Sequence, residues 1–396
     1  MRILQVTQSY YPFQQRGGPA TKVRAIARVL RKRGNEVTVL TADLGIGPGE
    51  ITSVKAVKAP EGWQSDLDDV EVIYLSTRAH YRDLTVNPGV LGFCERRLRD
   101  FDVVHIYGLY DTLGPAAGHY CRKHGVPYFL EPLGMTRPID RGFLGKRLWK
   151  AFAISYLRGV SRWIATSGLE RDDLRDAGVP SEKILLRFNG IDREEFKNLP
   201  AAGAFRTNLG IPGNVRIVLF LGRLIPRKGA DLLIEALAQI GDDNLKLIIA
   251  GPEGENGYLN FLRDKARAWG IAPRVLFPGP LYGEARKQAF VDATVFALPS
   301  RYENFGNTAA EAIACGTPVV VTTRCGIAPL VDQRAGLVTS YDCQAVGESL
   351  KNLLDDSVLY QRMRAGCSQV TKEISWDVLI GKMLDSYREV GDRSEI

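Results

Sequence analysis

Two carboxylates eight positions apart mark the stretch LPSRYENFGNTAAEAIACGTPVVV, Leu298 to Val321. Glu303 lies in a predicted loop that follows an apolar strand, Thr294 to Leu298. Ligands of open parallel sheets bind at the carboxyl ends of the strands, so this carboxylate is placed to accept hydrogen bonds from a ligand's hydroxyl groups. Glu311 lies among alanines in a predicted helix, Gly306 to Cys315. A carboxylate is costly to bury in so apolar a helix unless it is hydrogen-bonded or paired, so Glu311 is a second candidate.

The start of the same helix offers backbone N–H groups to an anion. Asn304 or Asn307 is the predicted N-cap, and Gly316 followed by Pro318 ends the helix. The first amides of a helix lack partners inside it and carry its positive dipole end, so they bind phosphate groups well. We therefore predict a substrate-binding segment made of Asn304, Phe305, Gly306, Asn307 and Thr308.

Two cations leave the end of another predicted strand, VRIVLFLG, which closes with Gly222. Arg223 and Lys228 stand in the loop that follows, RLIPRKGA. Such a pair can hold a diphosphate and stabilise the negative charge that develops when a nucleotide diphosphate departs. The alternative is an ordinary surface loop, where arginine and lysine are common.

The two-glutamate stretch resembles the E-x7-E signature of retaining glycosyltransferases of family four, a large class with the GT-B fold. The segment GRLIPRKG resembles the Gly-Arg and Lys-Gly pattern of the same family. The resemblance is specific over the second half of the chain and extends to the first half by layout. The alternative is structural, with a buried Glu311 paired to a core arginine and an exposed Glu303.

The resemblance implies roles for the candidates. Glu303 would contact the donor sugar, and Glu311 would bind the ribose hydroxyls of the nucleotide. Arg223 and Lys228 would neutralise the leaving diphosphate. Transfer would proceed with retention at the anomeric carbon and without a required metal. No cofactor is implied beyond the donor substrate, a nucleotide-diphosphate sugar.

The first half adds four candidates. Gly17 and Gly18 follow the first strand and precede a helix, so the backbone can approach a ligand closely there. The resemblance places this loop near the donor phosphates and the acceptor. His105 ends the strand DVVH, and Tyr107 stands where family members often carry a second histidine. We assign His105 a catalytic role and Tyr107 a binding role. A core histidine with satisfied nitrogens and a ligand-free glycine turn are the alternatives.

Strands and helices alternate in both halves, which predicts an α/β protein with two Rossmann-like, doubly wound parallel sheets facing a cleft. Residues 45–69 look irregular. A polar, turn-rich segment at 189–204 marks the boundary between the halves. We predict an N-terminal, acceptor-side domain at 1–190 and a donor-side domain at 191–372. The resemblance implies that the last helix, in 373–396, crosses back to the N-terminal domain.

Composition sets outer limits. The chain has 396 residues, a formal charge of +7 and six cysteines without a C-x-x-C pair. The first residues lack the apolar core of a signal peptide, and no apolar run reaches the length of a membrane span. These features predict a cytoplasmic protein. No RNA-binding motif is visible, and no histidine or cysteine cluster has metal-ligand spacing. The D-x-D at Asp66 and Asp68 precedes a strand, so we interpret it as a solvated loop.

Residues 141–159, RGFLGKRLWKAFAISYLRG, combine cations with bulky apolar side chains. A basic amphipathic helix can rest on an anionic membrane face or meet a diphosphate-linked lipid. We therefore predict a possible peripheral contact with the inner, cytoplasmic membrane face. The rival is a helix packed on its own sheet with its cations in water.

Together these features predict transfer of a sugar (a hexosyltransferase) from a nucleotide-sugar donor to a glycan or lipid-linked acceptor, in cell-surface polysaccharide biosynthesis. Two alternatives stay open. One is a nucleotide-sugar epimerase or a phosphorylase on the same fold. The other is a non-enzymatic polyanion-binding protein that uses the basic bias of residues 91–165, where twelve Lys and Arg face six Asp and Glu.

Overall fold

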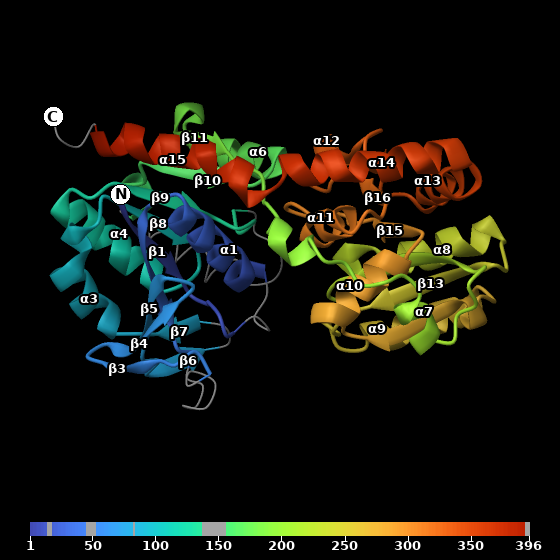
Figure 1. Ribbon diagram of the computed structural model, residues 1–396, viewed down its shortest axis with the longest axis horizontal. Coiled ribbons are helices and arrows are strands. Elements are labelled where there is room, and N and C mark those ends of the chain that lie inside the picture. Colours follow the sequence, from blue (N-terminus) through green and yellow to red (C-terminus); the bar gives the residue numbers. More distant parts are fainter. Residues whose placement is uncertain (14–17, 45–52, 82–83, 137–155, 393–396) are drawn as a thin grey trace. The chain divides into compact units, whose positions relative to one another are not determined.

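The structure is a computed structural model that describes residues 1–13, 18–44, 53–81, 84–136 and 156–392 (Figure 1). The chain divides into two compact units. Unit 1 comprises Met1–Phe188 together with Leu379–Ile396, and unit 2 comprises Asn189–Val378. The chain therefore passes between the units twice, after residues 188 and 378, close to the predicted boundaries at 190 and 372.

Unit 1 contains a nine-stranded sheet in the order β11-β10-β9-β8-β1-β2-β5-β4-β3, parallel except for the pairings made by β3 and β4. The strands from β10 to β5 in this order are mostly apolar and buried, as expected for a sheet that helices cover on both faces, whereas β3, β4 and β11 are more exposed. The strands are β1 (Arg2–Thr7), β2 (Glu36–Ala42), β3 (Val57–Ala59), β4 (Gly62–Leu67), β5 (Val70–Leu75), β8 (Val103–Tyr107), β9 (Tyr128–Glu131), β10 (Arg162–Ala165) and β11 (Ile184–Leu186).

A separate hairpin in unit 1 pairs β6 (Ala79–Tyr81) with β7 (Leu84–Val86). The prediction that residues 45–69 are irregular is wrong for β3 and β4, which form an antiparallel extension of the sheet on β5. These two strands are short and rich in polar residues, so the hydrophobic periodicity of the sequence did not reveal them. The helices of unit 1 are α1 (Gly18–Lys32), α3 (Gly89–Arg97), α4 (Leu113–His124) and α6 (Gly168–Asp176).

Unit 2 contains a six-stranded, all-parallel sheet in the order β14-β13-β12-β15-β16-β17. The strands are β12 (Arg216–Leu221), β13 (Leu245–Ala250), β14 (Val275–Gly279), β15 (Val295–Leu298), β16 (Val319–Thr322) and β17 (Gly336–Thr339). The helices are α7 (Ala204–Asn208), α8 (Ala230–Ile240), α9 (Tyr258–Ala268), α10 (Gly283–Asp292), α11 (Asn307–Ala314), α12 (Ala328–Val331), α13 (Cys343–Asp355) and α14 (Ser357–Glu373).

Each sheet has one point at which the strand order reverses. In unit 2 the first strand, β12, has β13 on one side and β15 on the other. In unit 1 the first strand, β1, lies between β2 and β8 in the same way. Open parallel sheets bind ligands outside the carboxyl ends of the strands at such points. The predicted fold class, with two doubly wound parallel sheets, is confirmed.

The last helix, α15 (Trp376–Asp392), begins in unit 2 and belongs to unit 1 from Leu379 onward (Figure 1). Its apolar stripe is buried, and Tyr387 packs edge-on against Phe129 of β9 with ring centroids 4.7 Å apart. Burial of one stripe at helical spacing is what fixes this helix on its sheet.

The two ends of unit 2 are hydrogen-bonded to each other. The Ile191 N–H donates to the Ile374 carbonyl at 2.9 Å, and the Trp376 N–H donates to the Ile191 carbonyl at 3.1 Å. Gly190 lies against the Trp376 ring, where an added Cβ would come within 2.6 Å of a ring carbon. The entry and the exit of unit 2 therefore run side by side.

Candidate active site

Two loops leave the reversal point of unit 2, one after β12 and one after β15. The first contains Gly222, Arg223 and the short 3-10 helix η5 (Pro226–Lys228), and Gly229 leads into α8. The second runs from Pro299 to the N-terminus of α11. Because β12 and β15 pair in parallel, both loops start at the same edge of the sheet.

The two loops touch at a glycine. Gly229 has φ +73°, and an added Cβ would lie 2.2 Å from the Pro299 carbonyl oxygen. The Arg301 N–H also donates to the Arg227 carbonyl at 2.9 Å. A left-handed glycine is therefore what lets the loop of Lys228 approach the second loop so closely.

Lys228 and Glu303 form an ion pair across the two loops. Their side chains are 16% and 18% exposed, so the pair is partly dry and still open to a ligand. Lys228 reaches over Gly222, with its Nζ 4.0 Å from the position of an added Cβ. One cation and one hydroxyl acceptor therefore occupy the predicted place at the strand ends.

The backbone of Glu303 is fixed from both sides. Its N–H donates to the Arg324 carbonyl at 2.9 Å, and its carbonyl accepts from the Gly326 N–H at 3.0 Å. Such a two-sided bridge holds the loop still, so the carboxylate starts from a defined backbone position. The structural alternative predicted an exposed Glu303, but its side chain is only 18% exposed.

The N-cap of α11 is Gly306, with φ +104° and no side-chain cap. The prediction of Asn304 or Asn307 at this position is therefore wrong. A Cβ at Gly306 would lie 2.7 Å from the Cys325 Sγ, so close packing demands glycine where cap preference favours asparagine. Asn307 is the first helical residue, and its Oδ1 accepts a hydrogen bond from Asn189 Nδ2 at 3.1 Å.

Around the cap, the predicted binding segment differs from residue to residue. Phe305 is buried, and its carbonyl accepts from the Ile327 N–H at 2.7 Å. Asn304 and Thr308 are half-buried. The amides of Asn307 and Thr308 open the first turn of α11, where helix N–H groups have no partner inside the helix.

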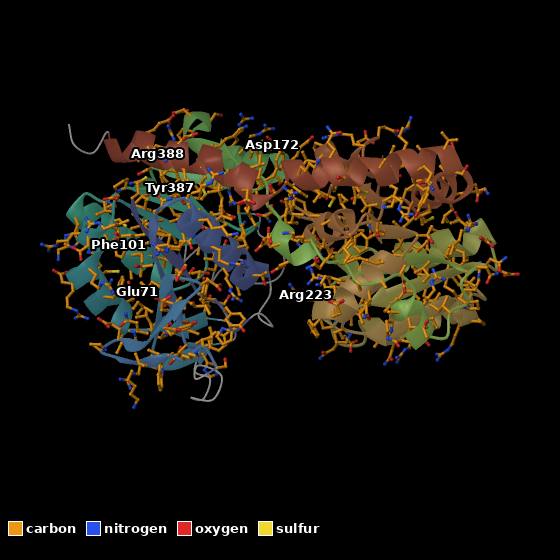
Figure 2. The ribbon with its side chains drawn as sticks, viewed as in Figure 1. Glu71, Phe101, Asp172, Arg223, Tyr387 and Arg388 are labelled. Carbon is orange, nitrogen blue, oxygen red and sulfur yellow. The ribbon has the colours of Figure 1, made fainter. Side chains whose placement is uncertain are left out.

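Arg223 is exposed (Figure 2), and its side-chain stem packs against Gly254 in the loop after β13. An added Cβ at Gly254 would lie 2.4 Å from the Arg223 Cγ, so the glycine makes room for the arginine stem. Leu224 and Glu253 pair as an isolated parallel bridge beneath it. The guanidinium thus starts from a fixed base at the same edge of the sheet as Lys228.

Glu311 is 18% exposed and pairs with Arg286 of α10, whose side chain is 32% exposed. The carboxylate is paired, as its apolar helix requires, but the arginine is not a core residue. Sequence reasoning missed Arg286. The sequence indicated that Glu311 needs a cationic partner, but it did not indicate which arginine of the chain supplies it.

In unit 1, His105 and Tyr107 are buried inside the protein. His105 stacks on Tyr107 with ring centroids 4.0 Å apart, and its Nδ1 is hydrogen-bonded to the Tyr387 hydroxyl. Gln5 Nε2 donates to the Tyr107 hydroxyl at 3.1 Å. Burial lowers the pKa of His105 well below its usual range, assisted by nearby Arg187, so the imidazole is neutral. His105 is therefore a core residue, but among the described residues its Nε2 has no hydrogen-bond partner, so the alternative of a histidine with both nitrogens satisfied is met only in part. The catalytic role stays a prediction.

A buried ion network lies beside His105. Glu131, at the end of β9, accepts from Lys22 with one carboxylate oxygen and from Arg187 with the other. The side chains of Lys22, Glu131 and Arg187 are 6%, 0% and 2% exposed. Burial lowers the pKa of Lys22 to about 8, although Glu131 favours its charged form. His105 Nε2 lies 3.7 Å from the Glu131 carboxylate. Sequence reasoning missed this network entirely.

The loop that contains Gly17 and Gly18 lies only partly within the described residues. Gly18 is exposed and begins α1, whereas Gly17 lies outside the described residues. The basic segment also lies mostly outside them, since residues 137–155 are not described. The assignments of Gly17, Gly18 and the basic segment stay predictions.

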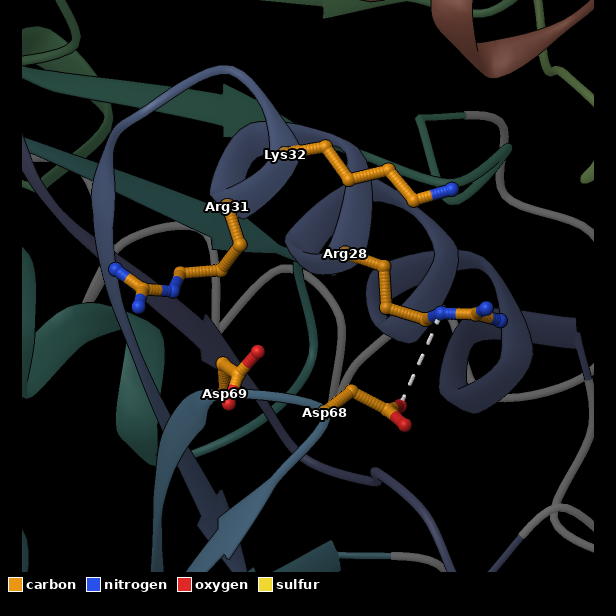
Figure 3. A pocket seen from close by; sticks show the side chains of 5 residues that line it. All are labelled: Arg28, Arg31, Lys32, Asp68 and Asp69. Atoms are coloured by element: carbon orange, nitrogen blue, oxygen red, sulfur yellow. Dashed lines mark ion pairs between the residues drawn. The ribbon is translucent and has the colours of Figure 1, made fainter.

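The D-x-D belongs to a hairpin and not to a loop. Asp66 is in β4, while Asp68 and Asp69 form the turn to β5 with φ +58° and +59°. Asp68 accepts from Arg24 of α1 at 2.7 Å. This turn and α1 enclose a pocket of about 290 Å³, lined by Arg28, Arg31, Lys32, Asp68 and Asp69 (Figure 3).

Arg24 and Arg28 of α1 therefore form ion pairs with Asp68, whose carboxylate a D-x-D metal site would need as a ligand. Among the described residues, no group of three or more His, Cys, Asp or Glu side chains could hold a metal ion. The expectation that no metal is required remains a prediction, since it concerns the reaction.

Comparison with known sequences gives two family matches. Residues 203–369 match the family described as glycosyl transferases group 1, and residues 17–190 match the glycosyl transferase 4-like domain. The D-inositol 3-phosphate glycosyltransferase 1 of Catenulispora acidiphila is 31% identical over 324 residues, 76% of either chain. An uncharacterized glycosyltransferase of Methanocaldococcus jannaschii is 27% identical over 405 residues, 98% of either chain.

Another relative, the D-inositol 3-phosphate glycosyltransferase of Xylanimonas cellulosilytica, is 32% identical over 58% of this chain, and the match spans 57% of that relative's length. Among solved structures, Anabaena HepE in complex with UDP and glucose matches with a TM-score of 0.77 and 20% identity, over 98% of this chain and 100% of that one. Sucrose-phosphate synthase from Thermosynechococcus elongatus matches with a TM-score of 0.74 and 20% identity, over 98% of each chain. At this identity the structural likeness concerns the fold.

Proposed function

The chain belongs to the glycosyl transferases group 1 family, and from this premise we propose that it moves a sugar from a nucleotide-diphosphate sugar to a glycan or lipid-linked acceptor, with retention at the anomeric carbon. The observation that carries the proposal is the Lys228–Glu303 ion pair, which stands at the strand-order reversal of unit 2. The pair lies in the loops where parallel sheets bind their ligands. It offers a cation for a phosphate and a carboxylate for a sugar hydroxyl.

The diphosphate of the donor would meet three positive groups. Arg223 and Lys228 both follow β12, and the first amides of α11 belong to the loop that follows the neighbouring strand. Preorganised positive groups of this kind act most strongly where charge develops, which here is on the departing diphosphate. They also fix the donor, so orientation contributes to the rate.

The sugar of the donor would meet Glu303. An ionised carboxylate accepts hydrogen bonds only, so it selects hydroxyl groups and orients the ring. In the reaction, the bond between the anomeric carbon and the phosphate oxygen breaks, and its electron pair stays on the diphosphate. An acceptor hydroxyl oxygen bonds to that carbon from the same face and gives its proton to the departing phosphate oxygen. This front-face route yields retention without a covalent enzyme intermediate.

Several neighbours support a nucleotide-sugar donor. The solved structures of Anabaena HepE hold UDP, UDP with glucose, or UDP-glucose. A starch synthase with the same fold, at 14% identity and a TM-score of 0.72, holds ADP and acarbose. These ligands belong to those proteins, and they motivate a test with several bases.

The test is incubation with UDP-, GDP- and ADP-sugars, with and without glycan acceptors, while free nucleoside diphosphate and the donor sugar are followed. We expect one donor to release its nucleotide, faster with acceptor, and Lys228→Ala to abolish most of this release. An epimerase would change the donor sugar without acceptor-dependent release. A phosphorylase would require inorganic phosphate. A polyanion-binding protein would turn over none of the donors, which would overturn the proposal.

A lipid-linked acceptor and peripheral contact with the cytoplasmic membrane face form the outer part of the proposal. They rest on the basic, apolar composition of residues 141–159. In the described residues, no helix is both long and apolar enough to cross a membrane. We expect salt-sensitive flotation with anionic vesicles, lost when Lys146, Arg147 and Lys150 are all changed to serine. Absence of wild-type binding at low salt would favour a soluble glycan acceptor and a role away from cell-surface polysaccharide.

A further inference from the structure

The ion pair of Arg286 and Glu311 joins two helices of unit 2. Arg286 lies in the first turn of α10, and Glu311 lies in the second turn of α11. The contact is made by one terminal nitrogen of the guanidinium and the carboxylate Oε2. Oε2 is itself buried. Among the described residues Oε2 has this ion pair and no hydrogen-bond partner, so Oε1 is the oxygen left to accept from a ligand's hydroxyl group.

Arg286 projects from α10, a helix that is anchored in unit 2. Ala289 and Phe290, three and four residues after Arg286, are buried in the core of unit 2. At the far end of α10, the Asp292 carboxylate accepts the backbone N–H groups of Gly203 at 2.5 Å and Arg206 at 2.9 Å. A helix fixed at its middle and at its end holds the base of the Arg286 side chain in one place.

The pair is poorly explained as a stabilising contact. Both side chains are partly exposed, and exposed ion pairs contribute little to folding stability. Its consequence for geometry is larger. A glutamate has three rotatable side-chain bonds, and its neighbours three and four residues away on the same helix, Asn307, Thr308, Ala314 and Cys315, include no cation. The guanidinium is the group that selects one carboxylate orientation.

We propose that Arg286 is the positioning residue of Glu311, and that the pair sets the preference for ribonucleotide over deoxyribonucleotide donors. This inference rests on the proposed function and on the ribose-binding role that the family resemblance implies for Glu311. With Oε2 held, Oε1 keeps a fixed direction and accepts from one ribose hydroxyl. A donor that lacks that hydroxyl leaves Oε1 without its partner, which costs affinity.

The test measures nucleotide binding by calorimetry. The nucleoside diphosphate that binds best among UDP, GDP and ADP is compared with its 2′-deoxy and 3′-deoxy forms. Hydrogen bonds to charged groups predict that the wild type binds the ribose form about 10- to 100-fold better than one deoxy form. In Arg286→Ala we expect this ratio to fall to about 3-fold or less, and in Arg286→Lys to recover in part. The ratio of diphosphate to monophosphate affinity should stay unchanged.

Two further variants separate a positioning role from a general one. Lys287→Ala removes a neighbouring cation of α10 that pairs with Glu284 at 3.2 Å, and it should keep the wild-type ratio. Arg286→Ala should have no further effect on the ratio in a Glu311→Gln background, because it acts through that carboxylate.

The outcomes are distinct. An unchanged ribose preference in Arg286→Ala, together with its loss in Glu311→Gln, would overturn the role of Arg286 and leave the proposed function intact. A Glu311→Gln variant that keeps the preference would overturn this inference and leave the proposed function intact, whereas a wild type that binds none of the three nucleotides would remove both.

Discussion

The two sheets of the molecule share a strand-order reversal beside their first strands, β1 and β12, and treat charge at their carboxyl edges in opposite ways. In unit 2 the Lys228–Glu303 pair is 16% and 18% exposed. In unit 1 the Glu131 carboxylate is completely buried between Lys22 and Arg187. Both groups stand at strand ends, so topology alone does not distinguish a binding site from a structural one.

Access to water makes the distinction. A buried charge must keep its partner, because an uncompensated charge in a dry interior is very costly. A pair that water can reach loses less free energy than a fully buried one when a partner is exchanged for a ligand. Glu131 is thus committed to the fold of unit 1, whereas the Lys228–Glu303 pair of unit 2 is available to a ligand.

The sharpest test of this contrast applies one substitution to both edges. Glu131→Gln leaves Lys22 and Arg187 without a carboxylate, and we expect a loss of about 3–5 kcal/mol in the stability of unit 1. Glu303→Gln should cost only about 0–1 kcal/mol in unit 2. Hydrogen exchange followed by mass spectrometry reads the two units separately. Equal losses at the two edges would break the comparison.

The second test measures activity instead of stability. Lys228→Ala should lower kcat/KM for the donor by about 10²–10³-fold, the usual effect of removing one preorganised group that meets developing charge. Arg227→Ala, in the same 3-10 helix, is the matched control and should retain most of the activity. Unaltered turnover in Lys228→Ala would place the chemistry elsewhere.

The close approach of the two loops gives a third, smaller effect. In Gly229→Ala the new methyl group would overlap the Pro299 carbonyl, so the loop of Lys228 must move. We expect stability to fall by about 1–3 kcal/mol and donor turnover to fall with it.

Gly241→Ala is the control for Gly229→Ala. It lies at the other end of α8 with a similar φ of +67° and nothing within 4 Å of an added Cβ. It carries the same backbone strain without the overlap, so its activity should remain that of the wild type. A matching loss of activity in both variants would show that loop contact is irrelevant.

Titration provides a fourth test. Burial lowers the pKa of Lys22 from 10.5 to about 8, so between these pH values the unfolded chain holds a proton that the folded chain has released. The free energy of unfolding therefore rises with pH above about 8. Urea denaturation at pH 7.5 and 9.5 should show the wild type gaining on Lys22→Met as the pH rises. A constant difference would mean that Lys22 titrates normally.

The last prediction is that removal of metal ions has no effect on the reaction. If Arg223, Lys228 and the α11 amides neutralise the leaving diphosphate, EDTA should leave donor turnover unchanged. Loss of activity that manganese or magnesium restores would show that a metal ion does this work, and the open edge of unit 2 would then be incomplete without it.

Much of unit 2 could be predicted from the sequence because its signals are local. β12 and β15 are uninterrupted apolar runs, and Gly316 follows α11 with φ +79° where a terminating glycine was expected. The loops that carry Lys228 and Glu303 follow directly from these strands. Their placement at adjacent strand ends required only the rule for parallel sheets.

What could not be predicted depends on residues far apart in the chain. Glu131 lies 109 positions from Lys22 and 56 from Arg187, and no local pattern links the three. The glycine N-cap of α11 is set by Cys325, which reaches Gly306 from another loop. Local preference named asparagine there, and tertiary crowding decided otherwise.

The hydrogen bonds between Ile191 and the segment Ile374–Trp376 have a consequence for inheritance. Unit 2 is a single uninterrupted stretch of the gene product, and its two junctions are neighbours. A recombination event that exchanges residues 189–378 therefore replaces a closed piece and leaves the sheet of unit 1 continuous through its own strands. Under the proposed function, the exchanged piece would carry the donor preference, and unit 1 would keep the acceptor preference. Two crossovers would therefore be enough to produce a new combination of donor and acceptor.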